Sequence, residues 1–324
     1  MRNKLKFNNI ENFIIFGGGE LLADICSFLI KNNKKILIIS SKKQINDKKF
    51  LLKKFLIKNK IKFIILKNLN NHSKWTHLIN KKSFGISHSC KWIFRESEID
   101  LFKGRLFNIH QSNLPSFRGG GGYSWNILTQ NFNSGTTIHL IDKKIDSGFS
   151  IINKKFSFPK NVKNSLAKMM KFSIKLHRKT INDFLRKIIE NKSFETRKIQ
   201  NNFESFYWPR LSTKKNAWIN WTWSADEIVN FINAFSYPYD GAATYFDQKI
   251  IRIHNARIIK ENLTFHPFQY GLIYRVSKGE AYIAAKNKSI IVDLKYINLK
   301  KGVLGKRLYT TNKKLEESIK NVKI

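Results

Sequence analysis

The stretch from Phe13 to Gly19, FIIFGGG, carries the first regular pattern of the chain, four apolar residues followed by three glycines. An unbroken apolar run that ends in a glycine turn is typical of a strand buried on both faces of a parallel sheet. Apolar residues at helical spacing follow between Glu20 and Ile30, and a second apolar run lies within Lys35–Ser40. This order of strand, helix and strand predicts the beginning of an α/β sheet with helices on both faces.

The same alternation continues through residues 1–192, which we expect to form one α/β domain with a parallel-rich sheet. A long amphipathic pattern at residues 164–189 predicts a helix that closes this domain. The other elements expected here are a helix at residues 48–57 and strands at residues 63–66, 84–86, 106–109, 136–141 and 149–158.

Residues 193–216 are polar, with few periodic signals, and are interpreted as a linker. We expect a smaller domain at residues 217–310 and a basic tail at residues 311–324. Ser224 and Glu227 form a capping-box pattern that predicts the start of a helix. Several short strands separated by turns are typical of a small β-barrel or sandwich. Such runs occur at residues 243–246, 250–259, 271–276, 281–285 and 290–294.

The chain of 324 residues has 60 Lys and Arg residues against 22 Asp and Glu, a formal net charge of +38. Its hydrophobic content of 42% is enough for real cores and excludes a wholly disordered basic protein. One interpretation of the charge is a polyanionic partner such as tRNA, DNA or an anionic membrane surface. We favour the other interpretation, a compositional bias, because lysine is spread along the whole chain together with asparagine, isoleucine and phenylalanine.

The two cysteines, Cys26 and Cys90, exclude a disulfide framework and a Cys-based metal cluster. No apolar run approaches the ~20 residues that cross a bilayer, and the first twelve residues lack a signal-peptide pattern. We therefore expect a cytoplasmic protein with no membrane partner. No pattern with metal-ligand spacing occurs, and four histidines are interpreted as ordinary surface or loop residues, namely His72, His77, His88 and His266.

The glycines at positions 17–19 also fit a dinucleotide-binding loop, but this alternative is disfavoured. Its fingerprint needs a third glycine where Leu22 stands, and an acidic residue at the end of the second strand, where Ser40 and Ser41 stand. A tight strand-to-helix turn explains the glycines without a bound nucleotide.

The most informative segment runs from Phe107 to Gly148 and gathers polar residues near expected strand ends. Asn108 and His110 are two residues apart, so in a strand both side chains point to the same face. The carboxyl edge of a parallel sheet is where α/β proteins form binding sites. The turn at Asp146 can return a carboxylate to this edge. A buried hydrogen-bonded cluster in some other α/β fold is the disfavoured alternative.

These elements resemble the folate-dependent formyltransferase family, which includes methionyl-tRNA formyltransferases and nucleotide-sugar N-formyltransferases. The family pattern is Asn-x-His, then x-Ser-x-Leu-Pro-x-x-Arg-Gly, then Gly-x-Thr and Asp-x-Gly. The matching residues here are Asn108, His110, Ser112, Leu114, Pro115, Arg118, Gly119, Gly135, Thr136 or Thr137, Asp146 and Gly148. The segments Ile219–Trp221 and Ala234–Ala242 also resemble the start of the family's small C-terminal barrel.

The resemblance implies a Rossmann-like formyltransferase domain followed by an OB-like β-barrel. It also implies transfer of a formyl group from 10-formyltetrahydrofolate to a primary amine, without a metal. His110 would accept a proton, Asp146 would orient His110, and Asn108 would donate to the developing oxyanion. The co-substrate would be bound by Ser87, His88, Ser89, Trp92, Ile141, Asp142 and Arg118. The acceptor would be contacted by Ser112, Leu114, Pro115, Gly119, Gly120 and Tyr123.

The acceptor amine is less constrained by the sequence. The tRNA enzymes of the family carry a basic insertion with proline and glycine after the second strand, and Ser40–Asn46 shows no such pattern here. We therefore favour a nucleotide-linked amino sugar as acceptor, with methionyl-tRNA as the alternative. A non-catalytic basic RNA-binding protein on the same scaffold is a third hypothesis, and a homodimer is the assembly considered.

Overall fold

The computed structural model describes residues 4–47, 51–198, 205–259, 263–297 and 302–320. The chain divides into two compact units, and each is described by itself. The first contains residues 1–119, 133–157 and 173–207, and the second contains residues 120–132, 158–172 and 208–324. Both units therefore combine segments that are separate in the sequence.

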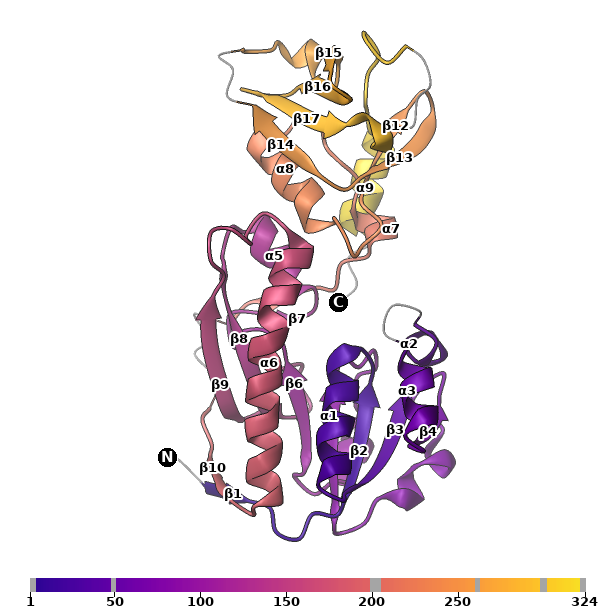
Figure 1. Ribbon diagram of the computed structural model, residues 1–324, viewed down its shortest axis with the longest axis vertical. Coiled ribbons are helices and arrows are strands. Elements are labelled where there is room, and N and C mark those ends of the chain that lie inside the picture. The colour runs from indigo at the N-terminus through magenta and orange to yellow at the C-terminus, as the bar shows by residue number, and fades with distance from the viewer. Residues whose placement is uncertain (1–3, 48–50, 199–204, 260–262, 298–301, 321–324) are drawn as a thin grey trace. The chain divides into compact units, whose positions relative to one another are not determined.

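The first unit is built around a seven-stranded sheet with the order β4-β3-β2-β5-β6-β8-β9 (Figure 1). The first five strands in this order are parallel, β8 runs antiparallel to β6, and β9 runs antiparallel to β8. This confirms the expected α/β fold with a parallel-rich sheet. The strands are β2 (Asn12–Gly17), β3 (Lys35–Ser40), β4 (Lys62–Ile65), β5 (Ser83–His88), β6 (Leu106–His110), β8 (Asn133–Leu140) and β9 (Ser150–Ser157).

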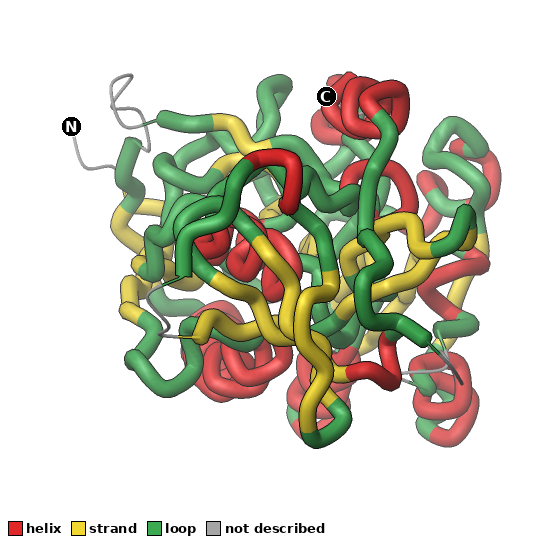
Figure 2. Tube along the Cα trace, turned by 90° about the horizontal axis from the view of Figure 1, so that it is seen from above, coloured by secondary structure: helices red, strands yellow, loops and turns green. Residues whose placement is uncertain are grey.

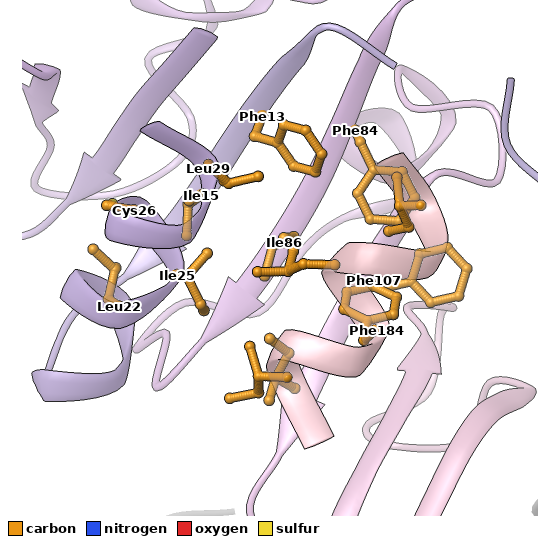
Figure 3. Packing of buried hydrophobic residues seen from close by; sticks show 14 of the residues in the cluster. Phe13, Ile15, Leu22, Ile25, Cys26, Leu29, Phe84, Ile86, Phe107 and Phe184 are labelled. Atoms are coloured by element: carbon orange, nitrogen blue, oxygen red, sulfur yellow. The ribbon is translucent and has the colours of Figure 1, made fainter. Parts of the chain in front are cut away.

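Helices α1 (Glu20–Lys31) and α6 (Leu166–Ile189) cover one face of this sheet (Figure 1). Figure 3 shows the core between the helices and the strands. Phe84 and Phe107 stack with ring centroids 5.4 Å apart, and Phe184 of α6 packs against both rings. The apolar runs show no alternation because parallel strands bury both faces.

A second core lies on the opposite face, where Ile14 and Phe16 project because they alternate with the residues of the first core along β2. The ring of Phe16 lies 5.3 Å from Trp75 and 5.0 Å from Phe94, measured between centroids. Short helical turns surround this core, namely His72–Lys74, Thr76–Leu78 and α4 (Glu96–Asp100).

Gly17, at the end of β2, has a φ of +124°, and a Cβ there would lie 1.8 Å from the carbonyl oxygen of His88. Gly19 has a φ of +92° but nothing within 4 Å of its Cβ position. We expect Gly17→Ala to lower the free energy of unfolding by more than about 3 kcal/mol, because clash and backbone strain add. Gly19→Ala, the matched control, should cost about 1 kcal/mol. Urea denaturation measures both, and equal costs would contradict this explanation.

Some elements of the first unit were not expected from the sequence. Strand β1 (Lys4–Lys6) pairs antiparallel with β10 (Ser193–Glu195), which lies in the range interpreted as a linker. Three-residue strands are too short to leave a periodic pattern. The helix expected at residues 48–57 is α3 (Leu52–Lys58), preceded by α2 (Lys42–Ile45), and residues 48–50 lie outside the described residues.

The second unit contains antiparallel strands, which confirms the expected small β domain. The strands form a hairpin, β12-β13, and a four-stranded sheet with the order β14-β17-β16-β15. Figure 2 shows the strands in yellow and the loops and turns in green. The strands are β12 (Ala242–Phe246), β13 (Lys249–Ile253), β14 (Ala256–Ile259), β15 (Ile273–Ser277), β16 (Glu280–Ala284) and β17 (Ser289–Asp293).

Helix α8 (Ala225–Ala234) begins at the predicted capping box, where the Ser224 side chain accepts from the Glu227 N–H and the Glu227 carboxylate accepts from the Ser224 N–H. Helix α5 (Gly122–Leu128) packs against α8, and the Ser124 hydroxyl donates to the Ala234 carbonyl. Further short elements are β7 (Arg118–Gly119), β11 (Tyr207–Trp208), α7 (Thr213–Asn216), α9 (Asn312–Lys320) and two helical turns, Pro267–Gln269 and Leu294–Tyr296.

The prediction of one strand at residues 250–259 was wrong. The structure divides this range into β13, which pairs with β12, and β14, which pairs with β17. His254 and Asn255 lie between the two strands. A change of pairing partner breaks the strand although the apolar pattern continues, because strand pairing depends on distant residues.

Candidate active site

Asn108 and His110 lie at the carboxyl end of β6, between the parallel strand β5 and the antiparallel strand β8. In the register of β6 and β8, Asn108 lies opposite His139, and His110 lies opposite Thr137. Directly paired residues project to the same face of a sheet. The sheet edge therefore presents two histidines and one amide on a single face.

Asp146 reaches this face from the turn after β8, where its φ is +50°. Its Oδ1 lies 3.3 Å from Asn108 Nδ2 and 3.3 Å from His139 Nε2. Its Oδ2 lies 3.6 Å from His110 Nδ1 and accepts a 2.8 Å hydrogen bond from the Gly119 N–H. The structure thus brings together the three side chains that the sequence analysis assigned to catalysis.

The hydrogen bonds of His110 determine which ring nitrogen carries the proton. The Phe117 carbonyl lies 2.6 Å from His110 Nε2 and also accepts from the Ser112 hydroxyl at 2.9 Å. Since a carbonyl can only accept, Nε2 bears the hydrogen and the neutral ring has its lone pair at Nδ1. A proton taken up by His110 therefore goes to Nδ1, beside the Asp146 carboxylate.

The Asp146 carboxyl is almost completely buried, with 10% of its side chain exposed. Burial by itself raises its pKa, but the neighbouring His110 and His139 and the Gly119 N–H outweigh burial and hold the pKa below its usual range. Asp146 is therefore ionised at neutral pH, the state in which it stabilises a positive charge on His110.

The sequence analysis did not assign a role to His139. Its Nδ1–H donates to the Leu140 carbonyl at 2.9 Å, so Nε2 of the neutral ring accepts from Asn108 Nδ2 at 3.2 Å. The other proton of the same amide points to Asp146. Two acceptors thus orient the Asn108 amide, and only the pairing register places His139 opposite it.

A cavity of about 270 Å³ lies on the same face of the sheet. Leu106 lines it two residues before Asn108 on β6, which is ~7 Å along a strand. The Ile141 N–H donates to the Leu106 carbonyl, so the two residues extend the pairing of β6 and β8. The lining residues are Glu96, Ile99, Asp100, Gly104, Leu106, Leu140, Ile141, Asp142 and Lys143.

Two of the seven residues predicted to bind the co-substrate, Ile141 and Asp142, line this cavity. Ser87 lies beside Asn108 in the β5–β6 register. The Trp92 indole N–H donates to a backbone carbonyl, that of Lys67. The other five predicted residues are not among those that line the cavity, namely Ser87, His88, Ser89, Trp92 and Arg118.

The residues predicted to contact the acceptor divide between the two units. Ser112 and Leu114 are buried in the loop after β6, Pro115 follows them, and Gly119 binds Asp146 through its N–H. Gly120 and Tyr123 belong to the second unit, where the Gly120 N–H donates to the Trp208 carbonyl. Gly119 therefore contacts the hydrogen-bonded cluster directly, at Asp146. Ser112 contacts it through the Phe117 carbonyl, which His110 also binds.

Comparison with known proteins agrees with this geometry. Residues 11–173 match the sequence model of the formyl transferase family, and residues 211–309 match that of the formyl transferase C-terminal domain. The chain belongs to the formyl transferase family. It is a folate-dependent formyltransferase, as the resemblance in the sequence implied.

Three relatives illustrate the family. The chain is 29% identical to the bifunctional polymyxin resistance protein ArnA of Wigglesworthia glossinidia brevipalpis, covering 96% of this chain and about half of that protein (48%). It is 26% identical to a methionyl-tRNA formyltransferase of Finegoldia magna, over 90% of this chain and 91% of the relative. A crystal structure of the sugar 3N-formyl transferase WlaRD, with dTDP and 5-N-formyl-THF, has a TM-score of 0.66 at 24% identity, covering 88% of this chain and 98% of that one.

The described ranges of this formyltransferase contain no group of three His, Cys, Asp or Glu side chains placed to hold a metal ion. Within the same part of the chain, no helix is both long and apolar enough to cross a membrane. Cys26 is buried in the first core, and this burial raises the pKa of its thiol to about 12.

The interpretation of His88 as a surface or loop histidine was wrong, because the residue ends β5 and is only 2% exposed. Its ring contacts the Gly18 carbonyl. Burial lowers the pKa of His88 to about 4, although this hydrogen bond opposes the shift, and burial lowers the pKa of His177 to about 3. His88 stands between Ser87 and Ser89 in the sequence, and this polar setting gave no signal that the residue is buried.

These pKa values predict how stability depends on pH. In the unfolded chain both imidazoles titrate near 6.5, so stability is complete above about pH 6.5 and is lost as the pH falls toward 4. For His88 the loss amounts to about 3 kcal/mol. Urea denaturation at several pH values should show a shallower pH dependence for His88→Gln than for wild type. His77→Gln, at an exposed position, is the control, and equal slopes for wild type and His88→Gln would contradict the assignment.

Proposed function

We propose that this formyltransferase moves a formyl group from 10-formyltetrahydrofolate to a primary amine at the cluster of Asn108, His110 and Asp146. The observation that carries the proposal is the convergence of an ionised carboxylate, a lone pair on imidazole and an oriented amide within 3.3 to 3.6 Å. 10-Formyltetrahydrofolate supplies the formyl group when it is bound.

His110 is the acid–base residue of the proposed reaction. The attacking amine becomes cationic as it bonds to the formyl carbon and must lose a proton. His110 Nδ1 accepts it, because Nε2–H is already engaged with the Phe117 carbonyl. Asp146, facing Nδ1, then stabilises the imidazolium.

Asn108 stabilises the oxyanion that develops on the formyl oxygen in the proposed reaction. Its amide donates to His139 and Asp146 in the structure, so one N–H must turn toward the formyl oxygen as negative charge develops there. The remaining contact keeps the amide on this face of the sheet. His139 accordingly aligns Asn108 before the reaction begins.

The cavity beside Leu106 and Ile141 fits a flat, mostly apolar ring with a polar edge, as in a pterin. Its apolar lining comes from Ile99, Leu106, Leu140 and Ile141, and carboxylates at Asp100 and Asp142 can accept from ring N–H and amino groups. Since Leu106 is two residues from Asn108, a ring bound there would lie next to the cluster.

We favour a nucleotide-linked amino sugar as the acceptor. After β3, the Ser41 side chain accepts from the Gln44 N–H at the start of α2, and the Gln44 side chain donates to the Ser89 carbonyl. The segment in which the tRNA enzymes carry their basic insertion is thus a short turn tied to β5. The fold similarity to a sugar 3N-formyl transferase is consistent with this acceptor.

Methionyl-tRNA is the second candidate, supported by specific observations. The relative from Finegoldia magna is a methionyl-tRNA formyltransferase matched over 91% of its length, and the chain carries a formal net charge of +38. Polycation charge of this size attracts nucleic acid at low salt. The predicted homodimer is independent of this choice and stays a prediction.

The test offers both acceptor classes in parallel. The full chain is incubated with 10-formyltetrahydrofolate and a panel of nucleotide-linked 3- and 4-amino sugars, or with methionyl-tRNA, and products are identified by mass. We expect a formylated sugar. Formylation of the tRNA alone would overturn the sugar acceptor. No turnover with either class, together with salt-steep RNA binding, would favour the RNA-binding hypothesis.

A further inference from the structure

Arg118 was predicted to bind the folate co-substrate, but its guanidinium is occupied within the protein. Nε and Nη2 both donate to the Ile145 carbonyl, at 2.9 and 2.6 Å. Nη1 donates to the Ser205 hydroxyl at 3.2 Å. The side chain is therefore bound on both sides by groups of the first unit.

The backbone around Arg118 makes matching contacts. The Arg118 N–H donates to the Phe206 carbonyl at 3.0 Å, and the next N–H, of Gly119, donates to Asp146 Oδ2 at 2.8 Å. Arg118 thus binds the Ile145 carbonyl, and Gly119 binds the Asp146 carboxylate. Two successive residues therefore contact two successive residues of the turn.

We propose that Arg118 is a positioning residue that fixes the turn carrying Asp146 against His110. The inference rests on the proposed function, in which Asp146 stabilises the His110 imidazolium. Asp146 has a φ of +50°, a conformation that a non-glycine residue keeps only where its surroundings hold it. Arg118 stabilises this conformation by binding the carbonyl of Ile145, the residue directly before Asp146.

The guanidinium is needed for its shape as well as its charge. Its planar fork places two N–H groups on one acceptor and a third on another, an arrangement that a single ammonium cannot reproduce. Arg118→Lys keeps the charge and loses the fork. Because displacements of about 1 Å in an active site can cost ~100-fold in rate, we expect kcat to fall by ~10- to 100-fold.

The decisive experiment is a double-mutant cycle with Asp146→Asn, measured as kcat and KM for 10-formyltetrahydrofolate with the best acceptor. If Arg118 acts through Asp146, Arg118→Lys should change kcat less than about twofold in the Asp146→Asn background. KM for the folate should stay within about twofold of wild type. Losses that multiply, or a raised KM with unchanged kcat, would overturn the proposal.

Arg105→Lys is the matched control. Arg105 also donates from Nε and Nη2 to backbone carbonyls, of Ser83 and Asn80, but it stands directly before β6, at the end opposite to His110. Its replacement should leave kcat within about twofold. Arg118→Gln is the second variant, used in the same cycle if Arg118→Lys does not fold.

A second readout does not depend on turnover. In protein labelled with ¹⁵N-histidine, the His110 imidazole signals should move in Arg118→Lys in the same direction as in Asp146→Asn, and stay unchanged in Arg105→Lys. Unchanged His110 signals in Arg118→Lys would overturn the inference. If wild type shows no formyl transfer while these shifts occur, the proposed function fails and the positioning role stands.

Discussion

Alanine in place of His110 is expected to lower kcat for formyl transfer by ~10²- to 10⁴-fold, with KM for 10-formyltetrahydrofolate nearly unchanged. The reason is that His110 Nδ1 is the ring atom with a free lone pair on the face shared with Asn108 and Asp146. The expected folate cavity, lined by Leu106 and Ile141, does not include His110, so binding should persist.

The measurement is steady-state kinetics with separate titration of folate binding by intrinsic fluorescence. His77→Ala, at an exposed histidine, is the matched control and should keep wild-type kinetics. A His110→Ala protein that is folded, binds folate and keeps more than a tenth of kcat would remove His110 from the mechanism.

Asparagine in place of Asp146 is expected to lower kcat by ~10²-fold or more. The substitution preserves shape but removes the charge that faces His110 Nδ1 at 3.6 Å. One carboxylate oxygen becomes an amide nitrogen, so the side chain can no longer accept from both Asn108 and Gly119. The imidazolium formed during the reaction then lacks its counter-charge.

Asp142→Asn is the control for Asp146→Asn, because Asp142 is an acidic residue of the same loop whose carboxylate accepts from the Ser147 hydroxyl and the Lys144 N–H. Its replacement should act on KM for the folate more than on kcat. The result that would contradict the role of Asp146 is an equal loss of kcat in both variants, which would indicate a general effect of the loop.

The sheet could be predicted from the sequence because its strands carry their own signal. The apolar run at 13–16 ends at Gly17, where the structure shows a close backbone approach, and apolar residues at 36–39 and 106–109 located β3 and β6. That Asn108 and His110 share one face of the sheet could be predicted from their spacing of two residues on one strand. Asp146 followed from a family pattern, since a turn residue 36 positions away has no local relation to a strand.

The residues that the sequence analysis missed depend on distant pairing. His139 faces Asn108 only because β8 runs antiparallel to β6 in one register. Arg118 binds Ile145 and Ser205, which lie far along the chain, so its motif position alone did not show that its guanidinium was occupied. The break between β13 and β14 has the same cause, a change of partner.

The central claim is direct transfer of the formyl group to an amine with His110 as the proton acceptor. It is tested by one single-turnover measurement with a ¹³C-formyl donor and the best acceptor, followed by ¹³C NMR and protein mass. We predict that the label passes from the folate to the acceptor nitrogen, without labelled protein, and that His110→Ala stops this passage. Label appearing on the protein, or released as formate at the wild-type rate, would contradict the claim.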